Sequence, residues 1–201
     1  MTVVVLAVAI ALVAVIIAVV AVVVALRKNQ TKTAPHTPTT PKDPFAPEGD
    51  TTGDPRTLKA GDMLDWGVER TWIRGSLRLS QGGFTWTEHF FETDEGKAWL
   101  SVEEDPTLEL AVWDARPDVE LTPHAKTLEF EGVTYQLDEK GSGSYRSEGT
   151  TGLKAAGGMD YADYESSDGR LLSFERFDHG PWEVSVGRKV LPGSFTIYPG
   201  S

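Results

Sequence analysis

Two acidic residues each follow an aromatic residue by two positions within an alternating, partly apolar segment: Glu88 follows Trp86, and Asp163 follows Tyr161. Side chains two residues apart share one face of a β-strand, so each carboxyl group is expected among apolar neighbours. Burial raises the pKa of a carboxyl group unless a cation or a backbone donor holds its charge. Such acids occur at functional sites and also in structural pairs. Glu88 and Asp163 are therefore the candidates for acid-based catalysis, and the alternative, which we favour, is that each is a buried acid satisfied by a partner.

The partner predicted for Asp163 depends on the turn that follows it. A two-residue type I′ turn at Asp168-Gly169 places Asp163 opposite Phe174. Arg176 is then the predicted partner of this acid.

The partner predicted for Glu88 depends on the turn that precedes it. Arg78 reaches Glu88 only if the turn comprises residues 81–83, because that register points the arginine inward. If the turn uses the two glycines 82 and 83 alone, Leu77 and Leu79 lie there instead. The sequence leaves both registers open.

A conspicuous acidic run, Glu103-Glu104-Asp105, follows the apolar segment that begins at Trp99. A three-residue loop at 94–96 puts Val102 opposite Glu88 and turns Glu103 to the other, more polar face. Glu104 then lies at the end of the inner face near water, and Asp105 belongs to a turn. We expect this run to be solvated.

The remaining Cys, His and Gly patterns of the sequence predict neither a metal site nor a cofactor. The chain contains no Cys, and its four His residues lack any H-x-x-H or H-E-x-x-H spacing. The glycine pairs are turn signals, because no strand-to-helix phosphate-binding pattern is present. Trp66 and Trp182 lie beside predicted turns, so they are candidates for ligand binding together with Arg78 and Arg176.

The elements that must position these residues are β-strands. From Leu58 onward, Trp, Tyr, Phe and Val recur with a period of two, broken by Gly, Asp and Pro, and no window shows helical periodicity. Three short motifs recur in the same order, including Leu100-Ser101-Val102-Glu103 and Leu172-Ser173-Phe174-Glu175. We therefore predict an all-β domain at 57–201, built from two related antiparallel meanders, about 58–116 and 127–199, that pack together.

The segment before this domain has a different composition. Residues 3–26 form an uncharged apolar run long enough to cross a bilayer as one transmembrane α-helix, and no basic region precedes it. Residues 27–56 begin with basic side chains and continue as a Pro/Thr-rich linker that has little apolar surface to bury. Arg27, Lys28 and Lys32 directly follow the span, which predicts an N-terminus outside the cell and a cytoplasmic β domain. The opposite topology stays open.

The formal net charge of −11 excludes several partner classes. Nucleic acid binding requires a basic patch, and no Lys/Arg stripe is present. Anionic lipid would repel the acidic domain, so contact with the bilayer is expected through residues 3–26 alone. A protein or a polycationic ligand fits the charge better.

The order of motifs along the domain resembles a known family, the membrane-anchored bacterial proteins catalogued as domain of unknown function 4178. The residues that carry the resemblance are Gly61-Asp62, Trp86-Thr87-Glu88, Trp99-Leu100-Ser101-Val102-Glu103-Glu104, Tyr161-Ala162-Asp163-Tyr164-Glu165, Trp182-Glu183-Val184-Ser185 and Thr196-Ile197-Tyr198-Pro199. The family has no assigned activity and no catalytic residues to carry over. The resemblance implies a partner within a bacterial membrane complex.

Three functions remain open on these grounds. The leading hypothesis is a single-pass, membrane-tethered β module that binds another protein of a membrane complex without catalysis. The second is an enzyme with an acid-based site at Glu88 and Asp163 between the two meanders. The third is a purely structural subunit.

Overall fold

The computed structural model describes residues 53–66 and 69–200, and within them the protein is all-β apart from one short 3-10 helix. The predicted span at 3–26 and nearly all of the linker at 27–56 lie outside these residues. The elements are η1 (Pro55–Thr57), β1 (Met63–Asp65), β2 (Arg70–Trp72), β3 (Gly75–Gln81), β4 (Phe84–Thr93), β5 (Gly96–Glu104), β6 (Leu108–Ala115), β7 (Thr127–Phe130), β8 (Val133–Gly149), β9 (Ala156–Ser166), β10 (Arg170–Phe177), β11 (Glu183–Val190) and β12 (Thr196–Tyr198).

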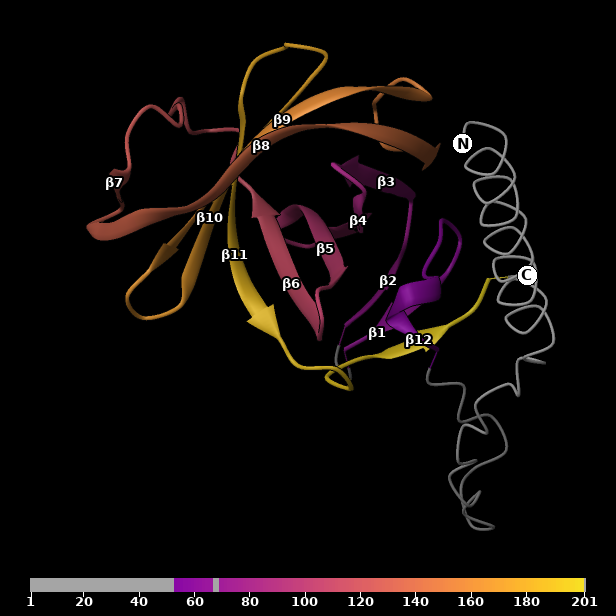
Figure 1. Cartoon of the computed structure of the whole chain (residues 1–201). Helices are drawn as coiled ribbons and strands as arrows, with labels where there is room; N and C mark the ends of the chain where they lie inside the picture. Colours follow the sequence, from indigo (N-terminus) through magenta and orange to yellow (C-terminus); the bar gives the residue numbers. More distant parts are fainter. Residues whose placement is uncertain (1–52, 67–68, 201) are drawn as a thin grey trace, which may run out of the picture. The chain divides into compact units, whose positions relative to one another are not determined.

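Eight of the strands close into an antiparallel barrel (Figure 1). Strands β3 to β6 form one four-stranded meander, and β8 to β11 form another. The pairing of β6 with β11 joins the meanders on one side, and the pairing of β3 with β8 joins them on the other. The prediction of an all-β body is confirmed, while the relation of the two meanders by duplication stays a prediction.

Most of the apolar packing lies on the outside of the barrel. The small sheet β12-β1-β2 and η1 cover the outer face of β4, β5 and β6, where Leu64, Ile197 and Phe195 pack against Leu100 and Val112. Successive side chains of a strand point to opposite faces of the sheet, so the residues between these outward apolar side chains point into the barrel.

A second outer cluster covers the other meander. Leu128 of β7 and Leu121 of the preceding segment pack against Leu172, Phe174 and Tyr164. The two clusters together take buried residues from seven of the eight barrel strands, which leaves the barrel interior free to carry polar groups.

The interior itself changes character along the strands. On β9, Met159 belongs to an apolar cluster inside the barrel, whereas Tyr161 and Asp163 line a cavity further along. On β10, Phe177 packs against the same cluster, and Glu175 and Ser173 line the same cavity. The barrel interior is therefore apolar in one part and acidic in the next.

The predicted register of the β4–β5 hairpin is wrong. Thr93 pairs with Gly96, so the connection has two residues and not three. This one-residue shift pairs Glu88 with Ser101 and turns Glu103 inward to the same face as Glu88. Glu104 points outward and forms an ion pair of 2.8 Å with Arg56. The prediction that Glu103 lies on the outer face is thus corrected.

The predicted register of the β9–β10 hairpin is wrong by one residue in the opposite sense. Ser166 accepts a hydrogen bond from the backbone N–H of Arg170 at 2.9 Å, and Gly169 takes a φ of +82°. Residues 167–169 therefore form a three-residue connection. As a result, Asp163 pairs with Ser173 and not with Phe174. Arg176 therefore points outward and cannot be the partner of Asp163.

The β3–β4 turn settles the alternative left open for Arg78. Gln81 pairs with Phe84, so Gly82 and Gly83 alone form the turn, with φ of +58° and +98°. Glycine adopts such values without strain. Leu77 consequently lies opposite Glu88 inside the barrel, and Arg78 points outward.

The outer clusters should carry a large share of the stability. Leu100 is fully buried in the first cluster, so Leu100→Ala is expected to lower the free energy of unfolding by about 2–5 kcal/mol. Urea denaturation of the full chain, followed by tryptophan fluorescence, measures this. Leu191→Ala is the matched control because Leu191 is 78% exposed. Equal stability of the two variants would contradict an external core.

Candidate functional site

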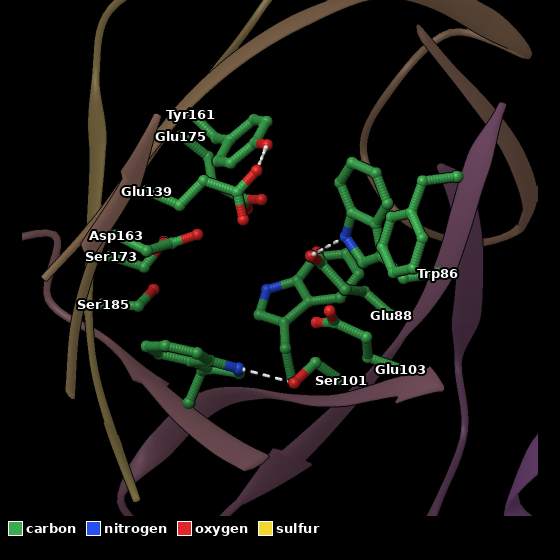
Figure 2. Close-up of a pocket in the computed structure, with 13 residues that line it drawn as sticks. Trp86, Glu88, Ser101, Glu103, Glu139, Tyr161, Asp163, Ser173, Glu175 and Ser185 are labelled. Carbon is green, nitrogen blue, oxygen red and sulfur yellow. Dashed lines mark hydrogen bonds between the residues drawn. The ribbon is translucent and has the colours of Figure 1, made fainter. Parts of the chain in front are cut away.

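A small chamber of about 90 Å³ lies inside the barrel (Figure 2). Seven of the eight barrel strands contribute to its wall, since β3 supplies none of the lining residues. The wall consists of Phe84, Trp86, Glu88, Trp99, Ser101, Glu103, Trp113, Glu139, Tyr161, Asp163, Ser173, Glu175 and Ser185.

Five carboxyl groups point toward this chamber from five different strands. Glu88 comes from β4, Glu103 from β5, Glu139 from β8, Asp163 from β9 and Glu175 from β10. None of the lining residues is Lys, Arg or His. The chamber therefore has a surplus of negative charge without a basic side chain in its wall to balance it.

Glu88 and Glu175 form the innermost acidic pair. Glu88 is only 8% exposed, and its Oε1 accepts a hydrogen bond of 3.2 Å from the indole N–H of Trp86. A side-chain hydrogen bond also joins it to Glu175, which requires a proton on one of the two groups. Burial raises the pKa of Glu88 to about 7 and holds that of Glu175 well above its usual range, so the pair shares a proton at neutral pH.

Asp163 faces this pair from the next strand. The Ser173 hydroxyl donates a hydrogen bond to its carboxylate, which favours the charged form. Burial is the larger effect, and together with the charges of Glu139 and Glu103 it raises the pKa of Asp163 to about 7.

Aromatic side chains form the rest of the wall. Trp86 packs edge-on against Tyr161 with ring centroids 5.7 Å apart. The Trp113 indole N–H donates a hydrogen bond of 2.9 Å to Ser101. The ring of Trp113 lies directly on Gly187 of the neighbouring strand, where a Cβ atom would collide with it. Trp99 completes a set of three indoles around the chamber.

Tyr161 fixes the position of one of the acids. Its hydroxyl donates a hydrogen bond of 2.7 Å to Glu139 and also contacts the Gln81 side chain. Burial and the negative charge of Glu139 raise the pKa of the Tyr161 hydroxyl, so it stays protonated. This residue therefore connects β3, β8 and β9 at the edge of the chamber.

The remaining residues proposed from the sequence lie outside the chamber. Arg78 donates to the backbone oxygen of Leu58 at 2.9 Å, and Arg176 pairs with Asp160 at 2.8 Å. The guanidinium of Arg176 also lies 4.6 Å from the ring centre of Trp182.

The two candidate binding tryptophans are half-buried packing residues. Trp66 packs against Phe195 with ring centroids 4.5 Å apart, in the first outer cluster. Trp182 packs against the second outer cluster as well as under Arg176. A role for Trp66 and Trp182 in ligand binding stays a prediction.

His89 also faces away from the chamber. It is fully buried on the outer side of β4, where it bonds to Ser76 at 2.8 Å and Thr87 at 3.0 Å. Burial lowers its pKa to about 3. His89 is therefore neutral and lies on the opposite face of β4 from Glu88.

Sequence reasoning found two of the five acids and missed Glu103, Glu139 and Glu175. The signal for Glu175 was present, because it occupies the position in the second repeated motif that Glu103 occupies in the first. Glu139 follows a β-bulge between Leu137 and itself, which breaks the alternation that would have revealed it.

The arrangement of the acids does not suit a metal ion. Within 53–66 and 69–200, no group of three or more His, Asp or Glu side chains converges closely enough to hold one. The carboxyl groups are instead distributed around a chamber with aromatic walls, as Figure 2 shows. Aromatic faces and carboxylates together attract organic cations.

Residues 59–192 match the protein family described as Domain of unknown function (DUF4178). The chain belongs to this family. It is 42% identical over 176 residues to an uncharacterized protein of Mycobacterium tuberculosis and to one of Mycobacterium bovis, and the alignments cover 82% of this chain and 84% of those proteins. No solved structure matches the chain. The chamber lies entirely within the part that matches the DUF4178 family.

Membrane anchoring is a separate matter from family membership. Among the residues placed by the structure, none belongs to a helix with the length and hydropathy needed to span a bilayer. The predicted transmembrane helix at 3–26 lies outside those residues and stays a prediction.

The acidic chamber should make the protein less stable as the pH rises. Unfolded carboxyl groups titrate near pH 4, whereas Glu88 and Asp163 have pKa values of about 7 in the folded state. Between these values the folded protein binds more protons than the unfolded chain, so its stability decreases with increasing pH. Thermal melts of the full chain are expected to give a midpoint several degrees lower at pH 8 than at pH 5.5.

The double variant Glu88→Gln/Asp163→Asn should flatten this profile, because neither amide titrates. Glu120→Gln is the matched control, since Glu120 is exposed on the outside of the barrel. A double variant with the same pH profile as the unaltered chain would show that other groups cause the dependence.

Proposed function

We propose that the barrel is a non-catalytic binding module for a small organic cation with an ammonium group. The observation that carries this proposal is a chamber inside the barrel with five carboxyl groups and three indoles but no basic side chain in its wall. An ammonium group supplies the missing positive charge and donates hydrogen bonds to several carboxylates at once. Its attached carbon atoms would pack on the indole faces, which attract cations as well.

The charge balance of the chamber supports this assignment. Buried carboxylates are costly without a cation, and in its absence they take up protons instead. The hydrogen-bonded pair of Glu88 and Glu175 is such a protonated arrangement. An entering ammonium group would replace the proton as the counter-charge, so binding should strengthen as the pH rises above 7.

Binding can be tested with n-butylamine, which is an ammonium ion at pH 8, and with 1-butanol as its uncharged isostere. Calorimetry and tryptophan fluorescence of the full chain are expected to detect the amine and not the alcohol. Glu88→Gln/Asp163→Asn should weaken amine binding at least tenfold, which corresponds to about 1.4 kcal/mol. Glu120→Gln should bind as the unaltered chain does. Equal affinity for amine and alcohol would overturn the proposal.

A second candidate function is supported by one specific observation. Acids from both meanders converge in one concave site, and two of them have pKa values near neutrality, as catalytic acids and bases do. Two of the three serines in the wall, Ser101 and Ser173, are engaged by Trp113 and Asp163. Nuclear magnetic resonance spectra of the bound amine, recorded over time, distinguish a binding module from an enzyme. A chemically changed amine would indicate an enzyme.

We also propose that residues 3–26 tether this module to a cell membrane, with the β domain in the cytoplasm. The support is the uncharged apolar run and the basic residues that follow it. A neighbouring protein of a membrane complex stays a predicted partner, and so does a purely structural role in such a complex. In-cell crosslinking from the outer surface of the barrel would test both.

The topology can be tested with a single cysteine, because the natural chain has none. Thr40→Cys is expected to resist a membrane-impermeant maleimide in intact cells and to react after the membrane is permeabilised. Labelling that occurs only after permeabilisation would support a cytoplasmic β domain. Labelling in intact cells would place the domain outside.

A further inference from the structure

The small sheet β12-β1-β2 carries a row of apolar side chains on its outer face. Trp72 is 53% exposed and Tyr198 is 37% exposed. Met63 lies between them, because it pairs with Trp72 on one side and with Tyr198 on the other. Directly opposed residues of neighbouring strands have Cβ atoms about 5 Å apart, so the three side chains form one continuous row. We call it the aromatic row, and it crosses all three strands of the sheet (Figure 1).

The other face of the same sheet is the buried one. Leu64 and Ile197 pack in the first outer cluster, and the Thr71 hydroxyl donates a hydrogen bond of 2.8 Å to the backbone oxygen of Glu92. Successive residues of a strand point to opposite faces, so the aromatic row points away from the barrel. The sheet is therefore anchored through one face and presents apolar groups to its surroundings through the other.

The charge around the aromatic row differs from that of the whole chain. Residues 59–74, which include β1 and β2, contain three basic and three acidic residues, and residues 194–200, which include β12, contain neither. Arg70 pairs with Asp65 at 2.7 Å on the same face. The net charge of −11 is thus carried by other parts of the chain. The repulsion from anionic lipid that the net charge predicts is therefore small at this face.

The chain enters the domain at the edge of this sheet. The Gly53 N–H donates a hydrogen bond of 3.3 Å to the backbone oxygen of Ile197, the residue before Tyr198. Residues 27–52 separate Gly53 from the apolar run at 3–26. A segment of that length spans about 80 Å even as a fully extended polyproline helix. A bilayer crossed by residues 3–26 is thus always within roughly that distance of the sheet.

We propose that the aromatic row is a docking surface for the headgroup region of the bilayer, on which the β domain rests through its small sheet. This inference rests on the membrane tether proposed above and is independent of the amine site. Trp and Tyr are enriched at membrane–water interfaces, because their rings are apolar while their N–H or O–H groups stay hydrated. Trp72 and Tyr198 supply one of each, with Met63 between them.

The size of the row distinguishes a lipid surface from a protein partner. A specific complex, including one with a second copy of this chain, buries roughly 800 Å² on each partner over about 20–30 residues. Three side chains on three short strands cannot supply that area. A tethered domain needs no such area, because confinement within about 80 Å of the bilayer gives an effective concentration on the order of millimolar. A weak contact is then sufficient.

Spin labels on the full chain in phosphatidylcholine vesicles test this proposal. The natural chain has no Cys, so Thr196→Cys places a single label on the outer face of β12, two positions from Tyr198. Glu120→Cys places the matched control label at an exposed site outside the small sheet. Molecular oxygen concentrates in lipid, whereas a nickel chelate stays in water. The ratio of oxygen to chelate collisions should be severalfold higher at 196 than at 120.

The double variant Trp72→Gln/Tyr198→Gln provides the second measurement. Both side chains are exposed, so the thermal midpoint of the variant should equal that of the unaltered chain. The label at 196 should then become as accessible to the chelate as the label at 120. Leu191→Gln is the matched control, because Leu191 is 78% exposed and lies outside the aromatic row. It should leave the collision ratio at 196 unchanged.

The remaining outcomes overturn the docking surface in distinguishable ways. A chain that floats with the vesicles and has equal collision ratios at 196 and 120 would overturn docking while leaving the tether intact. Protection of the label at 196 from both reagents, with dipolar broadening of its spectrum, would indicate a second copy of the chain on this face in place of lipid. A chain that does not float with the vesicles would overturn the tether and docking together.

Discussion

Five carboxyl groups line the interior of this barrel, and the three that are at least partly buried, Glu88, Asp163 and Glu175, take space from the apolar contacts that fill most small barrels. The repulsion among these acids must be balanced by packing elsewhere. The DUF4178 domain has two apolar clusters on the outside of its barrel, under the small sheet β12-β1-β2 and under β7, and one apolar cluster in part of the interior. The outer elements are therefore a requirement of the acidic interior and not accessories to it.

The site also depends on closure of the barrel. Glu88 and Glu103 come from the first meander, whereas Glu139, Asp163 and Glu175 come from the second. Neither meander alone encloses a chamber, and the acids approach one another only when β3 pairs with β8 and β6 pairs with β11. Folding of the barrel and assembly of the site are one event.

The sequence predicts the class of fold and part of the site for identifiable reasons. Alternation of polar and apolar residues predicts strands, and glycine, aspartate and proline mark the turns between them, so the all-β body and the inward position of Glu88 and Asp163 follow directly. The hairpin registers do not follow, because they depend on local bonds such as that between Ser166 and the Arg170 backbone. Closure through β3 and β8 joins residues about seventy positions apart, which no local pattern encodes. The bulge before Glu139 interrupts the alternation along β8, so the inward position of this acid does not follow from the sequence pattern.

The outer location of most of the packing has a consequence for how this family diversifies. In a barrel held together from within, a change of ligand preference disturbs the core, and the cost in stability limits which substitutions survive. Here Ser101, Ser173 and Ser185 face the chamber, while the apolar side chains next to them in sequence face the outer clusters. Two neighbouring positions on one strand thus evolve under different constraints. Substitutions at the inward positions therefore disturb the outer apolar clusters less than substitutions at the outward ones do.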